Sequence, residues 1–196
     1  MIKDFPLRLR RTDPPLAERL KNQDQGFTLI ETIIYLALFA MFMGGAIAAA
    51  YNIFEASDRN QAKAMAQEEG NFLVAKIEWA LSGAQIINSP PAPLADSTLW
   101  VTRVDGFDGA GAPILTPVVI SLSGTDMRLV INPAINTPIT LNNSAVTITN
   151  LSFSHTYPSG DGINPESLSA SFTVSTKTAG GLAISQDFFT AKYLRK

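Results

Sequence analysis

The chain has 196 residues, a net charge of −2, 46% hydrophobic residues and no cysteine. This length holds one modest domain in addition to a long helix, and it excludes a second large domain. The small net charge argues against a broad nucleic-acid-binding surface, and the lack of cysteine excludes disulfides, thiolate metal sites and cysteine nucleophiles.

Residues 1–26 mix charged side chains with Pro6, Pro14 and Pro15 and show no sustained hydrophobic periodicity. We expect them to form a leader that is removed, and not a folded part of the protein. Basic residues outnumber acidic ones in this leader, and they lie close to the apolar stretch that follows. The positive-inside rule therefore predicts a cytoplasmic N-terminus and an exported C-terminal part.

The next stretch is long and apolar. Residues 32–54 are 23 consecutive residues without a charge, rich in Ile, Leu, Phe, Met and Ala. About 20 such residues cross ~30 Å of hydrocarbon as a helix, and a helix is the conformation in which a single segment satisfies its own backbone in lipid. The sequence therefore predicts that this stretch forms a single membrane-spanning helix.

An acidic residue, Glu31, directly precedes the uncharged stretch. A charged side chain within the bilayer costs about 2.5 to 3.5 kcal/mol on insertion scales, so a counter-charge is expected. Cleavage between Gly26 and Phe27 would create an α-amine four residues before Glu31. In one helix, or between neighbouring helices displaced along a common axis, these two charges could neutralise each other.

Residues 26–31, Gly-Phe-Thr-Leu-Ile-Glu, and the apolar run after them resemble the prepilin signal of type IV pilins and type II secretion pseudopilins. The resemblance implies that a prepilin peptidase cuts between Gly26 and Phe27 and N-methylates Phe27. It also implies that Glu31 sets the register of each incoming subunit. The implied partners are other major and minor pilins or pseudopilins, the inner-membrane assembly platform and membrane lipid.

Two other interpretations of the N-terminal region fit less well. An ordinary membrane anchor would place Glu31 at the interface, yet an acid within a membrane segment usually indicates function. A conventional secretory signal would be cut near residues 46–50, but its apolar core would exceed the expected 7 to 15 residues. N-terminal sequencing separates these cases, because a start at Phe27 supports the prepilin signal and a start near Tyr51 supports conventional cleavage.

Within the apolar stretch, Ala40, Gly44 and Ala48 recur at every fourth position. Small side chains on one stripe of a helix allow another helix to approach closely. We interpret this stripe as a surface for subunit packing, although Gly and Ala are also common in membrane helices in general.

Residues 55–83 are polar but keep apolar side chains at helical spacing: Met65, Phe72, Leu73, Ile77, Ala80 and Leu81. This pattern predicts that one helix extends from residue 27 to residue 81, with an anchoring half at 27–54 and an amphipathic half at 55–83 that packs on a domain. Gly83 is a plausible C-cap. Residues 84–97 are rich in proline and predict a loop.

Residues 98–196 predict a β-rich exported head. The candidate strands cover residues 98–104, 118–122, 127–132, 137–141, 146–157, 168–176 and 184–194. A phase shift in the alternation predicts a bulge near Asn150. We expect an α+β fold in which one long N-terminal helix packs on an antiparallel sheet. This arrangement resembles the pilin architecture, most closely that of minor pseudopilins of the H or J type or of minor pilins.

The head offers little for catalysis. His155 is the one histidine of the chain, and its strand phase favours a structural role. Residues 105–111 and 159–162 space acids with glycines as calcium loops do, but both are more typical of turns. We therefore expect no enzyme, no catalytic or metal site and no cofactor, with calcium at these two loops as the alternative. Lys192, Arg195 and Lys196 form a small basic end that we interpret as solvated.

Together these observations predict a structural subunit, a minor pilin or pseudopilin, that assembles through its N-terminal helix into a type IV pilus or a type II secretion pseudopilus. The alternative is a membrane-anchored extracytoplasmic adhesin or DNA-binding module that does not enter a filament. Crosslinking between subunits through residues 27–54 discriminates the two.

Overall fold

The computed structural model describes residues 27–157 and 166–193. The predicted leader with Gly26, the loop at 159–162 and the terminal Arg195 and Lys196 lie outside the described residues. The chain divides into two compact units, Met1–Asn52 and Ile53–Lys196.

One helix, α2 (Leu29–Ser82), begins in the first unit and ends in the second. Residues 29–52 of this helix span about 36 Å at 1.5 Å per residue, which exceeds ~30 Å of hydrocarbon. Every residue from 32 to 52 is exposed, and the most apolar window has a mean hydropathy of 2.2. By length and composition this helix can cross a membrane.

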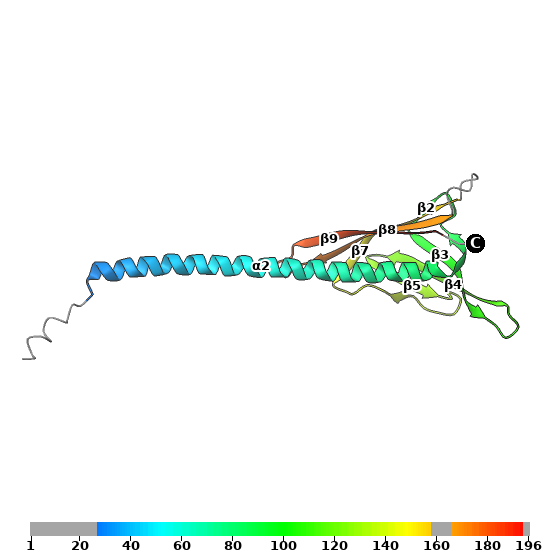
Figure 1. Cartoon of the computed structure of the whole chain (residues 1–196), viewed down its shortest axis with the longest axis horizontal. Coiled ribbons are helices and arrows are strands. Elements are labelled where there is room, and N and C mark those ends of the chain that lie inside the picture. Colours follow the sequence, from blue (N-terminus) through cyan, green and yellow to red (C-terminus); the bar gives the residue numbers. More distant parts are fainter. Residues whose placement is uncertain (1–26, 158–165, 194–196) are drawn as a thin grey trace, which may run out of the picture. The chain divides into compact units, whose positions relative to one another are not determined.

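In the second unit, the rest of α2 packs on two antiparallel sheets (Figure 1). One sheet has the order β1-β3-β4-β5-β6 and the other has the order β2-β7-β8-β9. The strands are β1 (Ala84–Ser89), β2 (Ala95–Asp96), β3 (Thr98–Phe107), β4 (Pro113–Ser123), β5 (Asp126–Ile131), β6 (Ile139–Thr140), β7 (Val146–Thr156), β8 (Ser167–Lys177) and β9 (Ala183–Tyr193). The predicted α+β fold is confirmed, with two small sheets in place of one.

The helix face that packs on the sheets is lined by small and branched residues: Ala62, Ala66, Gly70, Leu73, Ile77, Ala80 and Leu81. Four of these residues were predicted from their spacing, but Met65 and Phe72 are 41% and 43% exposed and lie off this face. The sequence pattern favoured the larger side chains. The structure also buries Ala62, Ala66 and Gly70, because these small residues allow the helix backbone to approach the sheets.

The strands bury alternate residues, as a sheet with one packed face requires. In β8 the predicted inward set is confirmed, since Leu168, Ala170, Phe172 and Val174 are all buried. In β7 the predicted bulge is also confirmed: the register shifts between Thr149 and Ser152, and Asn150 has a φ of 56°. Tyr157 follows β7 and is exposed.

Two short segments differ from the sequence prediction. Residues 84–97, predicted as a loop, contain β1 and β2, which pair with β3 and β7. The pairing of β1 is interrupted by two register irregularities, so no regular alternation marked it. The strand predicted at 137–141 shortens to Ile139–Thr140, consistent with Pro138, which cannot donate a ladder hydrogen bond.

An arginine from β3 caps the C-terminus of α2. Arg103 Nη1 donates to the Trp79 carbonyl oxygen at 2.9 Å, and the guanidinium lies 3.9 Å from the centroid of the Trp79 ring. Gly83 follows the helix but is not among the residues with positive φ, so the predicted glycine cap is wrong. Gly83 instead lies against β3, where a Cβ would be 3.2 Å from the Val104 carbonyl oxygen.

Candidate assembly site

The candidate site is the first turn of α2, which follows directly on the predicted cleavage point. Thr28 precedes the helix and caps it, because its Oγ1 accepts a hydrogen bond from the Glu31 backbone N–H at 3.3 Å. A threonine at this position satisfies one of the donors that a helix N-terminus leaves without an intrahelical partner. The cap fixes where the helix begins, and it places Glu31 in the first turn.

Glu31 is held by its own helix. Its Oε1 accepts a hydrogen bond from the Tyr35 hydroxyl at 3.2 Å, across one helical turn. Glu31 is also half-buried, whereas the other residues of the segment 27–57 are exposed. Glu31 is therefore partly covered by neighbouring residues, while the uncharged stretch that follows it is exposed and mostly apolar.

Phe27, the predicted new N-terminal residue, lies near the same tyrosine. The Phe27 and Tyr35 rings have centroids 6.3 Å apart at an angle of 75°, an edge-to-face contact. Phe27 itself is 75% exposed. Phe27, Glu31 and Tyr35 follow each other at intervals of four residues and share one side of the helix.

Tyr35 was not among the predicted site residues. The signal that could have found it is the spacing, because Tyr35 carries a hydroxyl and is four residues beyond the acid. Residues four apart on a helix are neighbours, so a donor at this position can reach the carboxylate.

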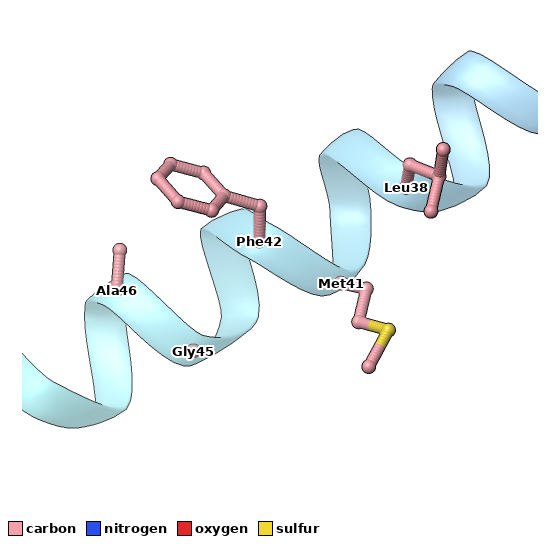
Figure 2. Close-up of a pocket in the computed structure, with 5 residues that line it drawn as sticks. All are labelled: Leu38, Met41, Phe42, Gly45 and Ala46. Atoms are coloured by element: carbon pink, nitrogen blue, oxygen red, sulfur yellow. The ribbon is translucent and has the colours of Figure 1, made fainter.

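The predicted packing stripe Ala40, Gly44 and Ala48 lies on exposed helix, and a Cβ added at Gly44 or Gly45 would meet nothing within 4 Å. Figure 2 shows a nearby surface hollow on this helix, where Gly45 lacks a side chain between larger neighbours. Leu38, Met41, Phe42 and Ala46 line the rest of the hollow. The hollow is thus lined by Gly45, the neighbour of Gly44 in the predicted stripe.

In the head, His155 has the environment of a structural residue. Its ring is buried, Nδ1 lies 3.0 Å from the Pro90 carbonyl oxygen, and Nε2 lies 2.9 Å from Glu166 Oε1. A carbonyl oxygen only accepts, so Nδ1 carries the proton. Both ring nitrogens are engaged in contacts that join β7 to the segments before β2 and β8.

The glycine-spaced loop at 105–111 is organised as a turn. Asp108 Oδ1 accepts hydrogen bonds from the backbone N–H groups of Ala110 and Ala112 at 2.9 and 2.8 Å. Within the described part of the chain, no group of three or more His, Cys, Asp or Glu side chains is arranged to hold a metal ion.

Comparison with known families gives one match, to the prokaryotic N-terminal methylation motif, over residues 21–47. The matched segment includes the predicted cleavage point, Glu31 and most of the apolar stretch. No curated protein and no solved structure matches the chain significantly.

Proposed function

Because the chain carries a prepilin signal of the type IV pilin and pseudopilin kind, we propose that it is a minor pilin or pseudopilin that assembles into a filament through α2. The observation that carries the proposal is the coincidence, at the start of one exposed apolar helix, of the methylation motif, Phe27 and a partly covered Glu31. A signal of this kind marks a substrate of prepilin peptidase. The role is structural and requires no catalytic residue and no cofactor.

The proposed maturation step is a cut between Gly26 and Phe27, followed by N-methylation of Phe27. The cut creates an ammonium group one residue before the Thr28 cap, in a segment where residues 32–54 carry no charge. Before assembly this charge and the Glu31 carboxylate face lipid or the interface. When subunits associate, the ammonium of one subunit pairs with Glu31 of another, and the pairing fixes the axial register.

The apolar part of α2 supplies the remaining contact. Its large side chains are exposed, so they must be covered by lipid before assembly and by neighbouring helices afterwards. Gly44 and Gly45 carry no side chain and a Cβ at either would meet nothing within 4 Å, so a second helix can approach closely there. The proposed path runs from a single-pass inner-membrane protein, with its N-terminus in the cytoplasm, to an extracytoplasmic filament.

The test uses Gly26→Ala and Glu31→Gln in cells that contain the prepilin peptidase and the other pilins. The chain has no cysteine, so Ile47→Cys gives a clean disulfide crosslink between neighbouring apolar helices. We expect Gly26→Ala to keep the leader, and Glu31→Gln to be processed normally but to lose crosslinking by about 100-fold or more, since breaking a buried ion pair costs about 3–5 kcal/mol. Normal crosslinking by Glu31→Gln would contradict the proposed assembly, and removal of the leader from Gly26→Ala would contradict the proposed cut.

A further inference from the structure

We propose that Tyr35 is a positioning residue for Glu31: its hydroxyl holds the carboxylate in the precursor and aims it during assembly. The inference rests on the proposed function, because it assigns a residue that prepares Glu31 for its partner amine. It starts from a problem in the uncut chain. Before cleavage Phe27 has no free amine, so an acid at the edge of an apolar helix needs another donor.

The structure supplies that donor within the same helix. Tyr35 Oη lies 3.2 Å from Glu31 Oε1, and Tyr35 is four residues further along α2, where side chains meet across one turn. The nearby hydroxyl groups have other bonds. Thr28 Oγ1 accepts from the Glu31 N–H, and Thr32 Oγ1 donates to the Thr28 carbonyl oxygen at 3.3 Å.

Tyr35 also contacts Phe27, which becomes the N-terminal residue after the proposed cut. The edge-to-face contact between the Phe27 and Tyr35 rings places one side chain against both the future terminus and the acid. The contact with the Phe27 ring restricts the rotamers of Tyr35, and the Tyr35 hydroxyl then restricts those of Glu31. A carboxylate whose orientation is fixed loses less conformational entropy when it forms an ion pair with a second subunit.

A phenol suits this task because it leaves room for the partner. An ionised carboxylate has about four acceptor positions, so one hydrogen bond from Tyr35 leaves positions for an incoming ammonium. The hydroxyl and the amine can therefore bind Glu31 together. A lysine at position 35 would instead neutralise Glu31 within the subunit and compete with the partner.

The experiment compares Tyr35→Phe, Glu31→Gln and the double variant, each in the full-length chain with Ile47→Cys. Tyr51→Phe is the matched control, because Tyr51 lies on the same apolar helix, is 72% exposed and is 16 residues from Tyr35. Leader removal and the crosslinked fraction are measured in the same cells. A processed fraction equal to that of the parent excludes a general insertion defect.

We expect Tyr35→Phe to be processed normally and to lower the crosslinked fraction by about two- to tenfold, as the loss of one hydrogen bond predicts, while Tyr51→Phe has no effect. In the Glu31→Gln background, Tyr35→Phe should cause little or no further loss. The role of Tyr35 would be overturned by parent-like crosslinking of Tyr35→Phe. It would also be overturned if Tyr35→Phe lowered the crosslinked fraction equally in the parent and in the Glu31→Gln background. Parent-like crosslinking by Glu31→Gln alone would instead overturn the proposed function.

Discussion

At the scale of single residues, the head depends on a buried amide between its two sheets. Asn142 is 7% exposed; its Oδ1 accepts from the Met127 N–H at 2.8 Å, and its Nδ2 donates to the Val146 carbonyl oxygen at 2.9 Å. Met127 belongs to β5 and Val146 to β7, which lie in different sheets. One side chain therefore satisfies backbone groups at the start of a strand in each sheet.

Asn142→Ala should lower the free energy of unfolding of the detergent-solubilised chain by about 1–3 kcal/mol, because it leaves buried backbone groups without partners. Denaturant titration measures the change. Asn71→Ala is the control, since Asn71 is exposed on α2 and bonds only to Gln67 among the described residues; its effect should be within about 0.5 kcal/mol. Equal effects of both variants would show that Asn142 does not join the sheets.

At the scale of elements, the contact between α2 and β9 depends on a glycine. A Cβ added at Gly70 would overlap the ring of Phe188, and that ring stacks on Phe172 with centroids 5.5 Å apart. Gly70 thus provides the space in which an aromatic side chain of the edge strand reaches the core. Glu78 ties the same two elements together, because its carboxylate accepts from the Thr190 hydroxyl at 3.0 Å.

Gly70→Ala should destabilise the head by about 1–3 kcal/mol, although alanine favours helix by about 1 kcal/mol, because Phe188 must leave its position. Thermal unfolding followed by circular dichroism measures the loss. Phe188→Leu removes ring atoms from the overlap, so Gly70→Ala should cost less in that background. An unchanged or raised melting temperature for Gly70→Ala in the parent would mean that the ring does not rest on Gly70.

The helices and strands also show which features of the fold could be predicted from the sequence. The apolar run of α2, the inward alternation of β8 and the bulge at Asn150 follow from side-chain periodicity, so they could be predicted. The strand β1, the division into two sheets and the cap by Arg103 depend on contacts between residues distant in the chain, and no local pattern encodes them. At the candidate site, Phe27 and Glu31 were visible as a motif, whereas Tyr35 was missed although its spacing from Glu31 could have indicated it.

At the scale of the whole molecule, the chain combines two units with different surroundings. Residues 29–52 expose apolar side chains that water does not tolerate, and residues 53–196 enclose a core between a helix face and two sheets. An anchor alone would explain the first unit. The methylation motif at 21–47 supports processing by prepilin peptidase. Under the proposed cut after Gly26, the mature chain would begin with a charged amine at Phe27, next to the start of the apolar helix.

Maturation by a cut after Gly26 is tested most directly by mass spectrometry of the N-terminal peptide of the exported chain. The chain is taken from cells that contain prepilin peptidase. We expect the peptide to begin at Phe27 with one added methyl group on its amine. A chain that keeps residues 1–26, or one that begins near Tyr51, would contradict maturation after Gly26 and with it the proposed assembly through Glu31.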